Sequence, residues 1–207
     1  MGLTNIHDEI SQYLRQISPA SIMLTGGRSA EKLYSSWASS SECMSYFAGT
    51  NLYFSDERCL LPSDSQSNYG LVMKTLFAKG VPSNTILHRI EADSPDLELA
   101  ANNYSNLLPK SIDLLILSVG EDGHIASLFP HSPALYELKR SVMPVLGLKV
   151  PYSRLTITPL VIQSARNIIV IAEGVEKRKI YEKALQTPKD IDSIPARLVL
   201  NRTWVFD

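Results

Sequence analysis

The stretch that decides the fold is Ile112–Pro130, which reads IDLLILSVGEDGHIASLFP. Its first half is a short apolar run rich in branched residues, and it ends at Gly120, which predicts a buried strand. Asp122-Gly123 is a strong turn pair, and His124 follows it directly. In an open parallel sheet, functional groups sit where strands end and loops begin. Since a histidine exchanges protons near neutral pH, His124 is our candidate general base.

Predicted strands and helices alternate on both sides of this stretch. Further strands are expected at 21–25, 51–55, 85–90, 141–145, 154–158, 167–172 and 203–206, and helices at 4–17, 30–38, 71–77, 94–108, 160–165 and 175–186. This order predicts an α/β fold, a mostly parallel, Rossmann-like three-layer sheet with helices on both faces. No repeat or linker divides the chain, so we expect residues 1–207 to form a single domain.

Two of these elements carry more specific expectations. Ser94-Pro95-Asp96 is a good helix start, with a capping serine, a proline at the first helical position and an acid in the first turn. Apolar and polar residues alternate from Arg154 to Thr158, which predicts a strand with one buried face.

Composition narrows the range of functions. The net charge is −1, which argues against a nucleic-acid surface built on bulk positive charge but leaves room for a small anionic ligand. Cys43 and Cys59 lack metal-ligand spacing, and we interpret both as reduced thiols of a cytoplasmic protein. The N-terminal residues predict an amphipathic helix and not a signal peptide, and no apolar run is long enough to span a membrane.

The segment Thr25-Gly26-Gly27-Arg28-Ser29 lies between a predicted strand and a predicted helix. Backbone N–H groups at such a turn bind phosphate well, and the helix dipole assists. The segment lacks both the G-x-G-x-x-G fingerprint and the P-loop lysine, so no nucleotide cofactor is indicated. A plain tight connection is the alternative reading of the two glycines.

Charged residues follow the next strand. Asp56-Glu57-Arg58 comes directly after 51–55 and, in a parallel sheet, would lie beside the glycine turn. Arg58, Arg154 and Lys177 are expected near strand ends or helix starts, where they are candidates to converge on a phosphate. The alternative for each cation is an ordinary solvated surface position.

Taken together, these motifs resemble the 6-phosphogluconolactonase family. The matching segments are Thr25–Ser29, Ser55–Cys59, Ser67–Tyr69, Gly120–Pro130, Arg154–Thr158 and Gly174–Lys177. The resemblance implies the sheet fold shared with glucosamine-6-phosphate deaminases and ribose-5-phosphate isomerases. It also implies hydrolysis of 6-phospho-D-glucono-1,5-lactone to 6-phosphogluconate, with no metal and no organic cofactor.

The resemblance also assigns the site. His124 is expected to act on water, and Asp122 either orients its imidazole, binds a sugar hydroxyl or simply forms the turn. The expected substrate-binding set is Thr25, Gly26, Gly27, Arg28, Ser29, Asp56, Arg58, Gly120, Ser127, Arg154 and Lys177. Arg28 stands where many relatives have a small hydroxyl residue, so its contact with phosphate or with solvent stays open.

Two alternatives compete with lactone hydrolysis. A glucosamine-6-phosphate deaminase would use the same fold, but the position where that family carries a proton-exchanging glutamate is Phe129 in this chain. A non-catalytic sugar-phosphate-binding protein would need the glycine turn and the cations but not His124. In each case the partner is a small sugar phosphate and not a nucleic acid or a membrane, and the oligomeric state is not indicated.

Overall fold

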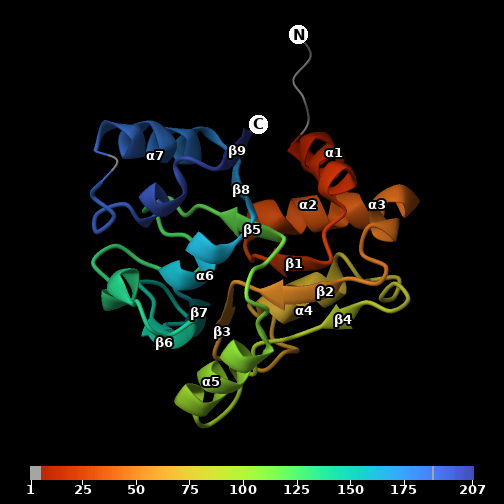
Figure 1. Ribbon diagram of the computed structural model, residues 1–207, viewed down its shortest axis with the longest axis horizontal. Coiled ribbons are helices and arrows are strands. Elements are labelled where there is room, and N and C mark those ends of the chain that lie inside the picture. The colour runs from red at the N-terminus through yellow and green to blue at the C-terminus, as the bar shows by residue number, and fades with distance from the viewer. Residues whose placement is uncertain (1–5, 188) are drawn as a thin grey trace.

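The main sheet of the protein is parallel and has the strand order β4-β2-β1-β5-β8-β9. The computed structural model describes residues 6–187 and 189–207 (Figure 1). The strands are β1 (Ser21–Leu24), β2 (Asn51–Phe54), β4 (Ile86–Leu87), β5 (Leu114–Ser118), β8 (Asn167–Ala172) and β9 (Thr203–Phe206). Every neighbouring pair in this order is parallel, which confirms the predicted α/β fold.

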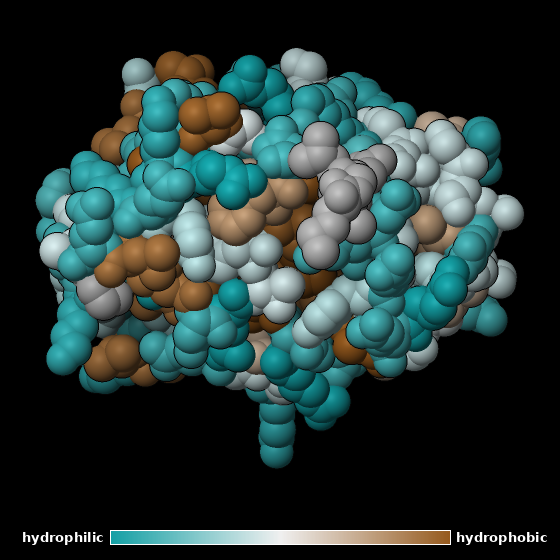
Figure 2. All heavy atoms as spheres, turned by 90° about the horizontal axis from the view of Figure 1, so that it is seen from above, coloured by the Kyte–Doolittle hydropathy of each residue, from teal (hydrophilic) through white to brown (hydrophobic). Residues whose placement is uncertain are grey.

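Helices flank this sheet. They are α1 (Ile6–Ile17), α2 (Arg28–Ala38), α3 (Ser41–Ser45), α4 (Asn68–Lys74), α5 (Leu97–Leu107), α6 (Pro159–Ser164) and α7 (Val175–Gln186), with 3-10 turns at Pro133–Tyr136 and Pro195–Val199. The predicted bounds of α7, β8 and β9 are confirmed. Residues 4 and 5 of the first predicted helix lie outside the described residues. The face viewed in Figure 2 is mainly hydrophilic or neutral, with hydrophobic side chains in small separate patches.

The core sits between the sheet and its helices. Every residue of β1 is buried, as are Leu114–Leu117 of β5, because a parallel sheet is covered on both faces. Helix α1 contributes Ile6, Ile10 and Leu14, one per turn, to the same core. This double covering explains why the strands read as continuous apolar runs in the sequence.

A second, antiparallel sheet was not predicted. It has the order β3-β7-β6, where β3 is Asp56–Arg58, β7 is Ser153–Ile157 and β6 is Val142–Leu146. The charged residues after β2 therefore do not simply end a strand, because Asp56 pairs with Thr156 and Arg58 with Arg154. In Figure 1 this sheet lies beside the main one, next to α6.

Two local predictions were wrong. Strand β7 is not half-buried, because it lies between β3 and β6 and its residues Arg154–Ile157 are all buried. Helix α5 does not begin at Ser94: its cap is Asp96, whose Oδ1 accepts from the backbone N–H of Leu99 at 2.9 Å. The Ser94 hydroxyl instead bonds within the preceding turn, donating to the Asp96 carbonyl at 3.1 Å.

Two buried tyrosines fasten the strand ends at which the site is built. The Tyr34 hydroxyl, from α2, accepts from the N–H of Thr25 at 3.1 Å and donates to its carbonyl at 2.7 Å. The Tyr104 hydroxyl, from α5, does the same to Phe54, at 2.7 and 3.0 Å. Each hydroxyl thus satisfies both backbone groups of a residue where its strand gives way to a loop, which holds the ends of β1 and β2 in place.

Candidate active site

A cleft of about 640 Å³ opens at the carboxyl edge of the parallel sheet. Most of the predicted site residues line it: Thr25, Gly26, Gly27, Arg28, Ser29, Asp56, Arg58, Gly120, His124, Arg154 and Lys177. Asp122 and Ser127 do not line it and act on residues that do. The strands run in one direction, so the loops after β1, β2, β5 and β8 meet at this edge.

Two helices point uncapped N-termini into the cleft. The N-cap of α2 is Gly27 and that of α7 is Gly174, both at φ 93°, and neither helix has a side-chain cap. Glycine takes this backbone conformation without strain. An uncapped first turn leaves backbone N–H groups for a ligand, and the helix dipole makes the place attractive to an anion.

Lys177 joins these two helix ends. Its ammonium donates to the hydroxyl of Ser29 in α2 at 2.9 Å and to that of Ser118 in β5 at 3.2 Å. Burial lowers the pKa of Lys177, the nearby Glu173 opposes this, and Arg28 adds to the lowering. A dianion bound here would remove that penalty by supplying the missing counter-charge.

Arg28 lies at the rim of the cleft. Its side chain is 90% exposed, and Nη2 is 3.6 Å from Oε1 of Glu121. An exposed pair of this kind holds neither partner firmly. Arg28 is therefore placed to meet a ligand from the solvent side.

Two glycines allow close approach at the cleft wall. A Cβ on Gly26 would lie 1.8 Å from Oδ1 of Asn68, and one on Gly120 would lie 2.2 Å from the ring of His124. No side chain fits at either position. The glycines therefore let α4 approach the turn after β1, and let the imidazole lie close against the end of β5.

His124 and Asp122 form a pair at the turn after β5. Asp122 Oδ1 accepts a hydrogen bond from Nδ1 of His124. It also accepts a weaker one, at 3.3 Å, from the backbone N–H of His124. Burial would raise the pKa of Asp122, but the hydrogen bond and charge of His124 outweigh it and lower that pKa to about 2. Asp122 is thus ionised at neutral pH and acts only as an acceptor.

The C-terminal segment supports this turn from behind. The backbone N–H of Ala196 donates to the Gly123 carbonyl at 2.8 Å, and a Cβ on Gly123 would meet Ile194 at 2.7 Å. Arg197, which is buried, donates to the carbonyls of Ala184 and Asp190 and to the hydroxyl of Ser193. The end of α7 and the segment after it are thereby joined behind His124.

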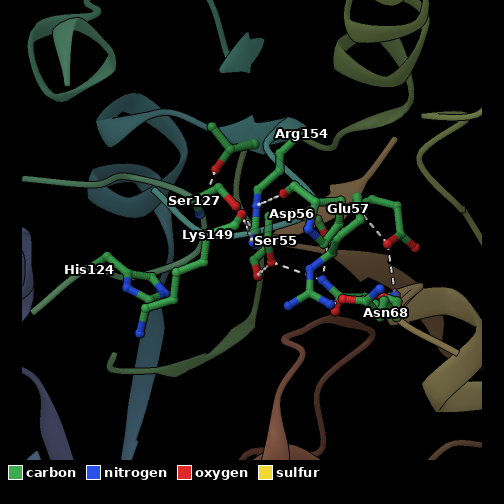
Figure 3. Close-up of polar contacts among 12 residues, drawn as sticks. Ser55, Asp56, Glu57, Asn68, His124, Ser127, Lys149 and Arg154 are labelled. Atoms are coloured by element: carbon green, nitrogen blue, oxygen red, sulfur yellow. Dashed lines mark hydrogen bonds and ion pairs between the residues drawn. The ribbon is translucent and has the colours of Figure 1, made fainter. Parts of the chain in front are cut away.

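Asp56 is the centre of a buried network (Figure 3). Its Oδ2 accepts from the Ser127 hydroxyl at 2.6 Å, and its Oδ1 accepts from Nδ2 of Asn68 at 3.1 Å. Nη1 of Arg154 lies 4.0 Å from Oδ2. Ser127 is fully buried, so its hydroxyl orients Asp56 and does not face the cleft.

Glu57 stabilises the start of α4 and does not line the cleft. Its carboxylate accepts from the backbone N–H groups of Asn68 and Tyr69, at 2.7 and 2.8 Å, and from the Ser67 hydroxyl at 3.1 Å. It therefore holds the N-terminus of α4 against β3. Burial raises the pKa of Glu57, while the hydrogen bonds from Tyr69 and Asn68 lower it in part.

The guanidinium groups of Arg58 and Arg154 line the cleft but are engaged by the protein. Arg58 Nη1 donates to the Gln66 carbonyl. Arg154 donates to the carbonyls of Pro151 and Lys149, at 3.1 and 3.4 Å, and its guanidinium carbon lies 5.4 Å from the centre of the Phe129 ring. Burial lowers the pKa of Arg154, as does the nearby charge of Arg58, while that of Asp56 raises it.

Several residues that line the cleft were not predicted as site residues. They are Lys32, Ser118, Val119, Glu121, Ala126, Lys149, Glu173, Gly174, Val175, Glu176 and Asp207. Ser118 was open to prediction, because it ends the central strand. Lys149 was not, because it follows a strand with no recognisable motif and reaches the cleft only through the packing of the second sheet.

Other kinds of site find no support in the described residues. Within them, no group of three or more histidine, cysteine, aspartate or glutamate side chains is arranged to hold a metal ion. Cys43 and Cys59 are free thiols, and burial raises the pKa of Cys59, which is opposite to what a nucleophile needs. No helix in the described part of the chain is both long and apolar enough to cross a membrane.

Comparison with known proteins identifies relatives over nearly the whole chain. Residues 3–206 match the family described as glucosamine-6-phosphate isomerases/6-phosphogluconolactonase. A 6-phosphogluconolactonase of Borreliella burgdorferi is 32% identical over 187 residues, covering 86% of this chain and 78% of that protein.

Solved structures show the same fold. A 6-phosphogluconolactonase from Shewanella baltica gives a TM-score of 0.83 at 22% identity, covering 97% of this chain and 91% of that one. A monomeric glucosamine-6-phosphate deaminase gives 0.83 at 18% identity, covering 100% and 96%. The same fold therefore occurs in a 6-phosphogluconolactonase and in a glucosamine-6-phosphate deaminase, so the fold alone does not distinguish the two activities.

Proposed function

Because the chain belongs to the family of glucosamine-6-phosphate isomerases and 6-phosphogluconolactonases, we propose that it hydrolyses 6-phospho-D-glucono-1,5-lactone to 6-phosphogluconate, a step of the oxidative pentose phosphate pathway. One observation carries this assignment: an ionised carboxylate orients a histidine in the same cleft as two uncapped helix N-termini and a lysine. A lactone that carries a phosphate needs a base near its carbonyl carbon, and it needs N–H donors and a cation for its phosphate.

The phosphate is assigned to the glycine turn. Backbone N–H groups at the start of α2 and α7, the Ser29 hydroxyl and the Lys177 ammonium face one another there. Such an arrangement matches a dianion in both charge and hydrogen-bond donors. Arg28 adds a cation from the rim.

The length of the site fits a six-carbon sugar. Ser118 contacts Lys177, and Gly120 lies against the His124 ring. These two residues are two apart at the end of β5, so the phosphate and carbonyl ends are separated by roughly 7 Å along the chain. The substrate is proposed to span this gap, with its phosphate at Lys177 and its C1 carbonyl at His124.

His124 is the proposed general base. Since Asp122 is ionised and can only accept, Nδ1 of His124 holds a proton, and in the neutral imidazole Nε2 is left as the basic nitrogen. Nε2 takes a proton from water as the water oxygen attacks C1. The tetrahedral intermediate then breaks its bond to the ring oxygen, which receives the proton from the imidazolium. The turn held by Ala196 and Ile194 supports this orientation.

The deaminase alternative is weakened at Phe129. That ring is 2% exposed and lies between His124, at 4.7 Å between ring centres and tilted by 36°, and Arg154. A phenyl ring cannot exchange the protons that amine release requires. It also leaves His124 beside an apolar surface and not beside a second acid.

The test is formation of 6-phosphogluconate from the lactone above the spontaneous rate. His124→Ala is expected to lose at least a hundredfold in kcat, since a general base typically contributes about 10²–10⁴-fold. His131→Ala is the matched control, because His131 is 72% exposed, pairs with Asp192 and does not line the cleft. Ammonia release from glucosamine-6-phosphate would favour the deaminase, and tight 6-phosphogluconate binding without turnover would favour a binding protein.

A further inference from the structure

Lys149 is a cleft residue without a structural task. It lies in the connection between β6 and β7 and lines the cleft. In the described part of the chain its ammonium has no hydrogen-bond or ion-pair partner, unlike Lys177 and Lys32. A cation that faces a cleft without a partner is available to a ligand.

The backbone on either side of Lys149 is hydrogen-bonded to the second sheet. Arg154 donates to the carbonyl of Lys149 at 3.4 Å and to that of Pro151 at 3.1 Å. Gly147 donates its N–H to the Tyr152 carbonyl at 2.6 Å, closing the connection. The buried Arg154 therefore positions the segment from which the lysine side chain projects.

The same segment is packed on the catalytic side of the cleft. A Cβ on Gly147 would lie 3.2 Å from the Phe129 ring, and that ring also contacts Arg154 and His124. In the view of Figure 3 the Lys149 side chain runs toward His124 and away from the Asp56 network. Lys177, by contrast, is tied to Ser29 and Ser118 at the opposite, phosphate end.

We propose that Lys149 contacts the carbonyl end of the lactone and stabilises the negative charge that forms there, and that Arg154 positions it. This inference rests on the proposed lactone hydrolysis. When water attacks C1, the electron pair of the C=O bond moves onto the carbonyl oxygen. The ammonium donates a hydrogen bond to that oxyanion and keeps its own proton. The charge disappears when the carbonyl re-forms and the ring C–O bond breaks.

Arg154 was expected to bind phosphate, and in this proposal it positions Lys149 instead. As a phosphate ligand it would have its guanidinium free, whereas two of its donors are used by the Lys149 segment. Its charge still faces the cleft. Its main effect is to fix where the Lys149 ammonium enters the site.

The experiment compares Lys149→Met with Lys149→Arg, and with Lys110→Met as a matched control at an exposed position that does not line the cleft. Lactone turnover is measured as kcat and KM, and inorganic phosphate is used as an inhibitor that occupies the phosphate end alone. For Lys149→Met we expect kcat to fall about a hundredfold, the scale for losing one oxyanion donor, with KM and phosphate inhibition changed less than about twofold. Lys149→Arg is expected to recover part of kcat.

Other outcomes overturn the proposal. A Lys149→Met enzyme with unchanged kcat shows that the ammonium does not act on the reacting group. A raised KM with weaker phosphate inhibition and normal kcat places Lys149 at the phosphate end. If the wild-type enzyme itself gives no turnover, the proposed function fails together with this inference, whereas active wild-type enzyme with an indifferent Lys149 removes the inference alone.

Positioning by Arg154 has its own readout. If Arg154 acts through Lys149, Arg154→Lys lowers kcat in the wild-type background but has little further effect on Lys149→Met, so the two losses are not additive. Fully additive losses would show that Arg154 acts independently. Melting temperatures of the variants, measured alongside, separate this coupling from loss of folded protein.

Discussion

At the scale of single residues, the proposed chemistry depends on which nitrogen of His124 carries a proton. The fold sets this through one contact, the hydrogen bond between Asp122 Oδ1 and His124 Nδ1. Gly120 makes room for the ring, and Phe129 packs on it from the other side. A change at Asp122 should therefore alter catalysis without moving the backbone.

Asp122→Asn is expected to lower kcat about a hundredfold or more and to leave KM nearly unchanged. An asparagine amide can donate to Nδ1, which would move the proton to Nε2 and leave no base facing the water. Steady-state kinetics on purified variants would measure the loss. A variant with wild-type kcat would show that Asp122 serves only to form the turn.

Asp122 also makes stability depend on pH. Its pKa is about 2 in the folded protein, against an ordinary value near 3.8, so the folded state favours the ionised form. This contribution is complete above about pH 5 and is lost as pH falls toward the folded pKa. By the linkage relation it amounts to about 2 kcal/mol as an upper figure. The difference in unfolding free energy between wild type and Asp122→Asn should therefore shrink between pH 6 and pH 3, and a constant difference would contradict it.

At the scale of elements, the site is assembled by a few helix ends. Helices α2 and α7 present N-termini without a side-chain cap to the cleft, although the Gly174 N–H before α7 donates to the Asp207 carboxylate at 2.7 Å, whereas the N-terminus of α4 is filled by the Glu57 carboxylate. The N–H groups of Asn68 and Tyr69 that bind Glu57 are not available to a ligand, whereas the first turns of α2 and α7 have no side-chain acceptor. Only α2 and α7 are thus proposed to bind phosphate.

Glu57→Ala is expected to destabilise the protein by about 3 kcal/mol, because it leaves several buried donors at the start of α4 without an acceptor. Urea unfolding would measure this. Glu91→Ala is the control, since Glu91 is 64% exposed and lies 3.9 Å from its arginine partner, and exposed pairs contribute about 0–1 kcal/mol. Equal losses in the two variants would refute the role of Glu57.

At the scale of the whole molecule, the cleft lies where two sheets meet. The parallel sheet supplies the proposed phosphate end through β1 and β8, while the antiparallel sheet supplies Asp56, Arg154 and the Lys149 segment. A ligand that spans the cleft binds only when both sheets are in place. Binding should therefore stabilise the folded chain as a unit.

At 100 times its Kd, 6-phosphogluconate should add about 2.7 kcal/mol of stability and raise the melting temperature by roughly 5–10 °C. Lys177→Met should lose most of this shift, because the buried ammonium faces Ser29 at the phosphate end, while Lys110→Met should keep it. Differential scanning calorimetry with and without the sugar acid would measure both. An undiminished shift in Lys177→Met would place the phosphate elsewhere.

The amino-acid sequence by itself determined the parallel core, the glycine turn and the position of His124 at a strand end. These are local properties: apolar runs predict strands, Gly-Gly and Asp-Gly predict turns, and parallel strands bring their ends to one edge. Only the tertiary structure decided that Ser127 orients Asp56 and that Asp56–Arg58 belongs to a second sheet. The physical reason is distance along the chain, because contacts between residues about 70 or 100 positions apart depend on packing that no local pattern encodes.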